Sequence, residues 1–220
     1  DLGFQCDNTG ENISDKNATY CELTGLYWAW KNLNVDRMGV AHYRRHFTMF
    51  KGAKTVDKAL TGEQFEELFQ KNGKDSIFAT PARRYVESIE NHYIHSLKGY
   101  EDIHAKDIER LKKAIHEYDS SYDESAKKVL GGNSAHMLNM LISSKENFDT
   151  YCAWLFPVID KVVALSADRE DQRRYAGALS EFCLDIWAQR NSKKIVELAL
   201  LETEKPTFFN RLLGYIKRKI

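Results

Sequence analysis

Short apolar runs alternate along this chain with longer stretches whose apolar residues recur at helical spacing. Brief apolar runs between turn-forming residues predict buried strands, whereas recurrence every three or four residues predicts amphipathic helices. The predicted strands are 38–41, 76–79, 137–142 and 195–201, and the longer predicted helices are 19–31, 61–69, 105–118, 143–156 and 173–189. Strands that alternate with helices pack as layers, so the pattern predicts an α/β domain.

Helix starts and chain length indicate how the domain is organised. Thr61 with Gln64, and Ser143 with Glu146, form capping boxes in front of apolar runs. A chain of 220 residues fits one domain, and Pro206 separates it from a final segment. We therefore expect one domain over residues 1–205 and a short basic amphipathic helix over residues 206–220.

Residues 208–219 mix bulky apolar side chains with Arg211, Lys217, Arg218 and Lys219. This composition is typical of a helix on an anionic membrane surface. A terminal helix docked on the domain would carry the same cations near its C-terminus, so both interpretations stand. No run approaches the ~18 apolar residues of a membrane span, and we identify no signal peptide.

Charge and cysteine content narrow the functional classes. Basic and acidic residues number 32 each, so the net charge is zero and we expect no nucleic-acid partner. Cys6, Cys21, Cys152 and Cys183 lack the spacing of metal ligands. Cys152 and Cys183 lie in apolar helical stretches and are predicted to be buried. A reducing cytoplasm is the natural setting, with peripheral contact to the inner face of the membrane if the terminal helix binds lipid.

The least common local pattern is His42-Tyr43-Arg44-Arg45-His46, directly after the predicted strand 38–41. Ligands of α/β proteins bind beyond the carboxyl ends of strands, and the planar fork of Arg forms paired bonds with phosphate. The pattern therefore predicts a phosphate-binding site, and a cluster of surface ion pairs is equally compatible with it.

Two weaker polar patterns accompany it. Asn8 and Thr9, with Lys16 and Asn17, form a polar loop before a helix, where backbone amides can bind anions. His92 and His95 share a helix face and could form a metal pair or the edge of a sugar site. A polar loop of this kind is more often an ordinary capping loop, and a histidine pair of this kind is more often solvated.

Glu181 is an acid within an otherwise apolar helical run, and Asp185 follows on the same face. A carboxylate beside a pocket could deprotonate a sugar hydroxyl. Alternatively, Arg173 and Arg174 could neutralise it as a structural ion pair. The sequence contains no phosphate-binding P-loop, dinucleotide-binding glycine turn, nucleophile elbow or Asp-x-Asp triplet.

Three stretches together resemble a bacterial family described as a domain of unknown function. They are residues 7–14 with Lys16 and Asn17, residues 20–32, and the HYRR signature at 42–45. Members of that family lie among capsular and exopolysaccharide genes and include galactofuranosyltransferases. The resemblance covers roughly residues 1–201. It departs from the family where His46 precedes Phe47, and where an earlier strand and helix, which family members carry, are expected to be missing.

The resemblance implies a GT-A-like fold, a mostly parallel sheet with helices on both sides. It also implies an inverting glycosyltransferase that moves galactofuranose or galactose from a UDP-sugar to a lipid-linked surface polysaccharide. Arg44 would stabilise the departing diphosphate without a divalent metal, and Glu181 would act as the base. The other donor-binding candidates are Asn8, Thr9, Lys16, Asn17, His42, Tyr43 and Arg45. The acceptor or sugar-binding candidates are His92, His95, His136 and Asn139.

Two other functions stay open at this point. A non-catalytic scaffold of the polysaccharide machinery would bind no nucleotide sugar. A phosphate-handling hydrolase would release free sugar or phosphate without needing an acceptor.

Overall fold

The computed structural model describes residues 3–203, so the expected helix at 206–220 lies outside the described residues. Its central sheet has four strands in the order β1-β6-β3-β7. These strands are β1 (Arg37–Val40), β3 (Ile77–Ala79), β6 (Leu141–Ser144) and β7 (Ile195–Glu197). Each of the four predicted strands overlaps one of them, so the apolar runs located the sheet.

The sheet is mixed, which corrects the expectation of a mostly parallel one. β6 runs antiparallel to both of its neighbours, β1 and β3, and β3 is parallel to β7. Because β6 lies between β1 and β3 and runs against both, two of the three neighbouring strand pairs are antiparallel. β1, β3 and β7 themselves run the same way, so their carboxyl ends meet at one edge.

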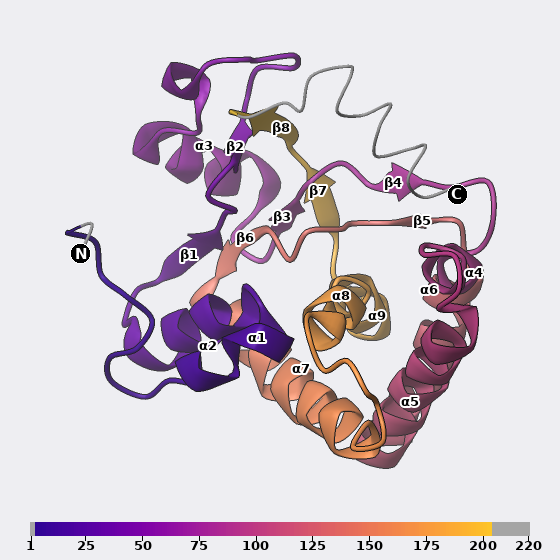
Figure 1. Cartoon of the computed structure of the whole chain (residues 1–220). Helices are drawn as coiled ribbons and strands as arrows, with labels where there is room; N and C mark the ends of the chain where they lie inside the picture. The colour runs from indigo at the N-terminus through magenta and orange to yellow at the C-terminus, as the bar shows by residue number, and fades with distance from the viewer. Residues whose placement is uncertain (1–2, 204–220) are drawn as a thin grey trace.

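Two short antiparallel pairs accompany this sheet (Figure 1). β2 (Arg45–Thr48) pairs with β8 (Ala199–Glu202), and β4 (Arg83–Arg84) pairs with β5 (Ser134–Ala135). The predicted strand 195–201 is therefore two strands. It divides at Leu198, whose N–H donates to Ala79 O at 2.9 Å before the chain turns away to pair with β2.

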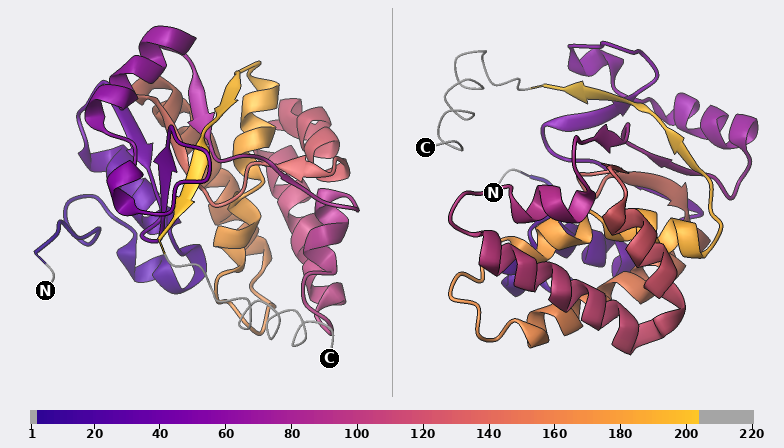
Figure 2. Two further views of the ribbon diagram at one scale, coloured as in Figure 1. Left: turned by 90° about the horizontal axis from the view of Figure 1, so that it is seen from above. Right: turned by 90° about the vertical axis from the view of Figure 1, so that its right-hand side faces the viewer.

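Side chains of β3 alternate between apolar clusters on the two faces of the sheet. On one face, Phe78 packs edge-on against Phe69 of α3 (Gly62–Asn72), with ring centroids 5.1 Å apart. On the other face, Ile77 and Ala79 join a larger cluster. The helices that contribute to it include α2 (Leu23–Asn32), α7 (Lys145–Leu165), α8 (Tyr175–Ser180) and α9 (Cys183–Arg190). Helices thus lie on both sides of the sheet (Figure 2).

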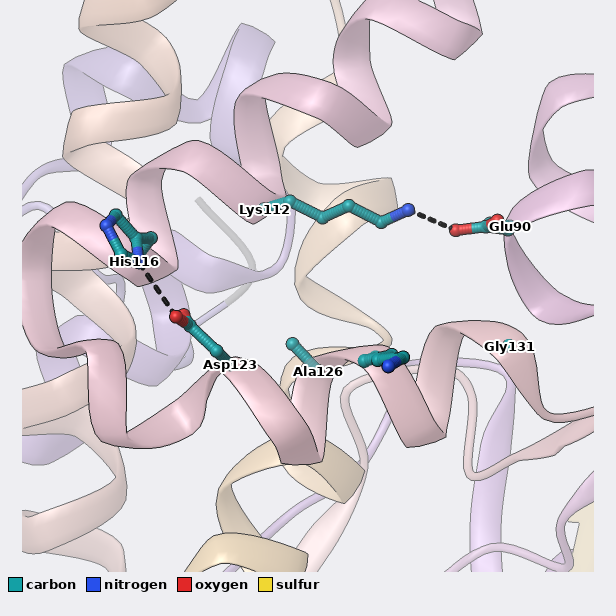
Figure 3. Close-up of a pocket in the computed structure, with 7 residues that line it drawn as sticks. Glu90, Lys112, His116, Asp123, Ala126 and Gly131 are labelled. Atoms are coloured by element: carbon teal, nitrogen blue, oxygen red, sulfur yellow. Dashed lines mark hydrogen bonds and ion pairs between the residues drawn. The ribbon is translucent and has the colours of Figure 1, made fainter.

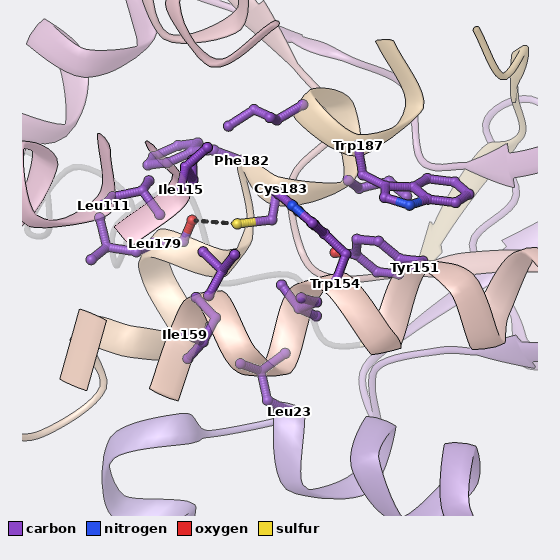
Figure 4. Packing of buried hydrophobic residues seen from close by; sticks show 14 of the residues in the cluster. Leu23, Leu111, Ile115, Tyr151, Trp154, Ile159, Leu179, Phe182, Cys183 and Trp187 are labelled. Atoms are coloured by element: carbon purple, nitrogen blue, oxygen red, sulfur yellow. Dashed lines mark hydrogen bonds between the residues drawn. The ribbon is translucent and has the colours of Figure 1, made fainter. Parts of the chain in front are cut away.

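The larger cluster continues away from the sheet into a layer of helices (Figure 4). α5 (Glu101–Asp119) packs against α7 and contributes Leu111 and Ile115. The outer helices are α4 (Ile89–Ile94) and α6 (Asp123–Gly131). Cys152 and Cys183 are buried as predicted. Burial of this apolar surface is the main favourable contribution to folding.

Helix starts were predicted with mixed success. The box at Thr61 and Gln64 is present with both of its hydrogen bonds. The second cap is Ser144 rather than Ser143, and its hydroxyl accepts from Asn147 N at 3.3 Å. Ser144 is the last residue of β6, whereas Ser143 lies one residue further from the helix start, opposite Met38, and its hydroxyl donates to Ser144 O at 3.0 Å.

The predicted helices 19–31 and 173–189 are both broken. Cys21, with a φ of 53°, separates α1 (Asn17–Tyr20) from α2. Glu181 and Phe182 separate α8 from α9. Helical spacing continues across both breaks, so it could not reveal them. Each break places a glutamate, Glu22 or Glu181, at a helix junction.

Three 3₁₀ segments complete the described part: η1 (Ser14–Lys16), η2 (Val56–Lys58) and η3 (Ser120–Tyr122). Among residues 3–203, no helix combines the length and apolar character needed to cross a membrane.

Candidate functional site

Charged and polar groups gather where the carboxyl ends of β1, β3 and β7 meet the start of β6. His42 follows β1, Arg83 begins β4 shortly after β3, and Asn139 precedes β6. Glu22 and Glu181 come from the two helix junctions. We call this group the strand-end site. Its members are linked by the effect of their charges on one another or by hydrogen bonds. They are Glu22, His42, Arg45, Arg83, Asn139, Arg174 and Glu181.

Glu181 is the most perturbed acid of this site. Burial and the nearby charge of Glu22 raise the pKa of its carboxyl from 4.5 to about 7. A hydrogen bond from the Leu138 backbone and the charges of Arg83 and Arg45 act in the opposite direction. A carboxyl with a pKa near neutrality can accept a proton at physiological pH and release it again, as a general base must.

Asn139 fixes the position of Glu22. It is buried, and its side-chain amide donates to Glu22 Oε1 and to Ser180 Oγ, both at 2.9 Å. Ser180 Oγ in turn donates to Gly177 O at 2.7 Å. Asn139 was predicted to bind the acceptor or sugar, and it lies beside Glu22 and Ser180, which were not predicted.

Gly177 allows this network to form by close approach of α8 to α1. A Cβ atom at position 177 would lie 3.0 Å from Cys21 Cβ and 3.0 Å from Tyr20 O. The glycine therefore lets the backbone of α8 contact the Tyr20–Cys21 turn, which leads directly into Glu22.

The HYRR stretch forms a tight turn rather than a continuous strand. Arg45 N donates to His42 O at 3.0 Å, and Arg45 Nε lies 3.5 Å from Glu202 Oε1. Burial and the charges of Arg45, Arg44 and Arg174 lower the pKa of His42, despite the opposing effect of Glu22. His42 is therefore neutral at pH 7. The guanidinium of Arg44 lies over the exposed ring of Tyr43, 4.6 Å from its centroid.

Arg83 and Arg174 are cations that sequence analysis did not assign to the site. The charge of Arg83 acts on Glu181, and that of Arg174 acts on His42 and Cys21. Within residues 3–203, neither guanidinium forms a hydrogen bond or an ion pair. Arg83 could have been found, because it follows strand β3 as His42 follows β1. Arg174 was named only as a structural ion-pair partner of Glu181, with Arg173; among residues 3–203, Arg173 pairs with Asp171 and no ion pair joins Arg174 to Glu181.

A buried ionic network anchors the loop that carries Arg174. Asp107 is fully buried on α5 and accepts hydrogen bonds from Arg169 Nε at 3.2 Å, Arg110 Nη1 at 3.3 Å and Tyr93 Oη at 3.2 Å. Arg169 also lies over the ring of Tyr175, 4.6 Å from its centroid. These contacts attach the segment between α7 and α8 to α5.

The same segment is fixed at its other end by Arg174 itself. Arg174 has a φ of 63°, and its backbone N–H donates to Ala18 O at 2.8 Å. The left-handed backbone of Arg174 lies just before α8. Together with the hydrogen bond to Ala18, it fixes the position of the Arg174 Cα atom, from which the side chain extends.

His136 flanks the site beside Asn139 and Glu181 around a small void. Its Nδ1 lies 2.6 Å from Asp185 Oδ1, its backbone N–H donates to Asp185 Oδ2 at 2.7 Å, and its Nε2 lies 3.7 Å from Glu197 Oε1. Burial lowers the pKa of His136, but the two carboxylates raise it more, so the net pKa lies above its ordinary value. Asp185, which was predicted to share a face with Glu181, holds this imidazole.

The N-terminal candidates mostly have structural contacts. Lys16 Nζ lies 3.4 Å from Asp160 Oδ1, and Asn17 Nδ2 donates to Cys21 O at 3.0 Å and Thr24 Oγ1 at 3.1 Å. Thr9 O accepts from the Trp28 indole at 3.0 Å, and Asn8 is exposed. Asn17 thus supports the turn before Glu22, whereas Lys16 faces α7.

His92 and His95 lie at α4, beyond the β4–β5 pair. His95 Nδ1 is 2.7 Å and His92 Nδ1 3.7 Å from Glu87, and the Tyr85 and His92 rings stack 3.8 Å apart. In the described part of the chain, no hydrogen bond or ion pair joins either histidine to Glu181. Nor do residues 3–203 contain a group of three or more His, Cys, Asp or Glu residues suited to holding a metal ion.

A hollow of about 450 Å³ lies between α4, α5 and α6, away from the strand-end site (Figure 3). Four of its charged groups form two pairs: Lys112 Nζ lies 2.5 Å from Glu90 Oε2, and His116 Nδ1 lies 2.7 Å from Asp123 Oδ2. Lys127 also lines the hollow. Because most of its charges neutralise one another, the strand-end site is the stronger candidate for chemistry.

Comparison with known proteins gives a family and a similar fold. A family model described as a domain of unknown function (DUF4422) matches residues 1–192. Among solved structures, the apo structure of the bifunctional glycosyltransferase WbbM is similar, with a TM-score of 0.75 and 24% sequence identity. That match covers 94% of this chain but 40% of the WbbM chain, and at this identity it shows the fold alone. No curated protein matches the chain.

Proposed function

We propose that the chain transfers a sugar from a nucleotide-sugar donor to an acceptor hydroxyl. It belongs to the DUF4422 family, and 94% of its length is similar in fold to part of the bifunctional glycosyltransferase WbbM. The observation that carries the proposal is a carboxyl group with a pKa of about 7, Glu181, under the influence of Arg45 and Arg83. His42 and Arg174 lie in the same cluster. A base and fixed cations are the two groups that this reaction needs.

The cations would bind the donor diphosphate. Arg83 and Arg174 have guanidinium groups without partners among residues 3–203, and Arg45 is held at the base of the His42 turn. Departure of a nucleoside diphosphate develops negative charge, which fixed cations stabilise. Arg44, at the tip of the same turn, is the further donor-binding candidate. With these cations in place, we expect transfer to survive EDTA.

Glu181 would activate the acceptor. Its carboxylate takes the proton from the acceptor hydroxyl while that oxygen attacks the anomeric carbon. The bond from the anomeric carbon to the diphosphate oxygen breaks, and its electron pair leaves with the nucleoside diphosphate. One displacement of this kind inverts the anomeric configuration. Neutral His42, and His136 with Asn139 on the flank, would contact the sugar hydroxyls.

The finer identity of the substrates follows the sequence resemblance. We propose a UDP-sugar, with galactofuranose or galactose as the transferred group, and a lipid-linked polysaccharide acceptor at the inner face of the membrane. Contact of residues 208–219 with that membrane stays a prediction, because those residues lie outside the described structure.

Donor binding provides the direct test. Calorimetric titration of UDP-sugars, with EDTA or with manganese, should show binding by the wild-type chain. Arg83→Ala and Arg174→Ala should each weaken it at least ~10-fold, because a hydrogen bond to a charged group contributes about 1.5–3 kcal/mol. Arg84→Ala is the matched control, since neighbouring strand residues point to opposite faces.

Three results would redirect the proposal. Binding only with manganese keeps a transferase but removes the cation mechanism. Release of free sugar from the donor without an acceptor favours a hydrolase. A folded chain that binds no donor would favour the scaffold function.

A further inference from the structure

A loop between β2 and α3 exposes three large apolar side chains. Met49, Phe50 and Val56 are 43%, 49% and 64% exposed. Isolated exposed apolar residues are common on protein surfaces, but a group of them in one loop marks a contact surface. We call residues 49–58 the apolar loop. In Figure 1 the segment between β2 and α3 forms the upper edge of the molecule.

The apolar loop has a defined backbone. Its base is closed by Leu60 N, which donates to Phe47 O at 2.8 Å, and by Thr48 Oγ1, which donates to Lys58 O at 2.6 Å. Within the loop, Ala53 N donates to Phe50 O at 3.1 Å, and Gly52 adopts a φ of 82°. The exposed side chains are therefore presented by a hydrogen-bonded turn at the surface.

Three lysines accompany these apolar residues in the loop. Lys51, Lys54 and Lys58 lie in the same loop, and its single acid, Asp57, lies 3.3 Å from Lys58 Nζ. Lys58 Nζ is also 5.7 Å from the centre of the Phe50 ring. Aromatic and aliphatic tips with lysines beside them match the boundary between acyl chains and anionic headgroups. The acidic residues of α3 begin beyond the loop, at Glu63.

We propose that the apolar loop is a membrane-contact element that places Phe50, Met49 and Val56 at the acyl boundary and its lysines against anionic headgroups. A protein partner fits less well, because lysine is depleted in the centres of protein interfaces. The inference stands apart from the transferase proposal and from the segment 208–219. β2 links the loop to Arg45, so this contact would hold the strand-end site near the bilayer surface.

Co-sedimentation of the full chain with vesicles tests the proposal. The wild type should bind phosphatidylglycerol-rich vesicles and bind pure phosphatidylcholine weakly. The variant Met49→Ser/Phe50→Ser/Val56→Ser should bind at least ~10-fold less tightly, which is about 1.4 kcal/mol. Replacing one loop lysine by Gln should weaken vesicle binding ~5-fold, because each lysine near an anionic surface contributes a factor of about this size to the affinity. All of these side chains are exposed, so the variants should fold.

Val86→Ser is the matched control, because Val86 is fully exposed but lies between β4 and α4, outside the apolar loop. It should bind vesicles as the wild type does. A second measurement uses Phe50→Trp, whose indole emission should shift to the blue with anionic vesicles and be quenched by brominated acyl chains.

Unchanged binding by the serine variant would overturn the proposal, as would an indole emission of the Phe50→Trp variant that vesicles leave unaffected. So would a wild type that binds neither vesicle but self-associates, with self-association lost in the serine variant. That outcome would make the loop a protein interface instead.

Discussion

Replacing Glu181 by Gln should make the protein more stable and less active. The pKa of Glu181 is about 7 in the folded chain, against 4.5 for an unperturbed glutamate. The folded state therefore retains a proton that the unfolded chain releases between those two values. Stability falls as pH rises through this window, because the folded state binds more protons than the unfolded one.

The magnitude follows from the two pKa values. A gap from 4.5 to about 7 corresponds to at most about 3 kcal/mol, since each tenfold change in proton affinity is about 1.4 kcal/mol. Solvent screening reduces this figure for a partly exposed group, so we expect a gain of about 2 kcal/mol at pH 8. Below pH 4.5 both states hold the proton, and Gln should bring no gain.

Urea unfolding followed by tryptophan fluorescence between pH 4 and pH 8.5 measures this difference. The wild type should lose stability across the window, and Glu181→Gln should lose less of it. Sugar transfer by the variant should fall by about 10²–10⁴-fold, because it lacks the base. Glu67→Gln, on the exposed face of α3, serves as the control and should change neither quantity.

A variant whose stability follows the wild-type pH profile would refute the reasoning. It would mean that Glu181 is either well solvated or paired in the folded protein. If the variant lost activity but its stability still followed the wild-type pH profile, the side chain would keep a role in transfer. Its burial would then no longer explain that role.

Other parts of the site give further predictions. Asp107→Asn should destabilise the fold by about 3–5 kcal/mol in urea unfolding, because it leaves Arg169 buried without its charged partner; it should also weaken donor binding measured by calorimetry. Asp185→Asn should cost more stability at pH 6 than at pH 8.5. The raised pKa of His136 gives a stabilisation that is complete below pH 6.5 and is lost as pH rises through the folded pKa. Equal costs at both pH values would contradict this prediction. Gly177→Ala should cost about 1–3 kcal/mol and reduce transfer, because its methyl group would press on Cys21; wild-type melting and activity would show that α8 can shift freely.

Local sequence patterns predicted the sheet and part of the site. The apolar run 38–41 located β1, and the general position of ligands beyond strand ends led to His42 and Arg45. Asn139 and Glu181 were also named, but the sequence could not show that both would lie near Glu22. That proximity depends on the breaks at Cys21 and after Ser180, which interrupt helices without interrupting their apolar spacing.

Long-range packing decided the remaining positions. Arg174 enters the site because its loop returns to Ala18, a contact between residues far apart in sequence. His92 lies in α4 and His95 directly follows its last residue, but nothing in their spacing says where α4 lies relative to β1. Spacing of three or four residues fixes neighbours on one helix, whereas the partners of that helix follow from the fold.

Positive φ angles are concentrated around the strand-end site. Among residues 3–203, the non-glycine residues with positive φ are Cys21, Leu138, Asn139, Arg174 and Ser192. The first four all lie beside Glu22 or Glu181 or within the site itself, and such conformations cost about 1–3 kcal/mol each. The fold thus tolerates strain at Cys21 to place Glu22, at Leu138 and Asn139 to hold both glutamates, and at Arg174 to set a cation beside them. Each strained residue positions a charged or hydrogen-bonding group, which is the pattern expected where stability has been exchanged for a preorganised site.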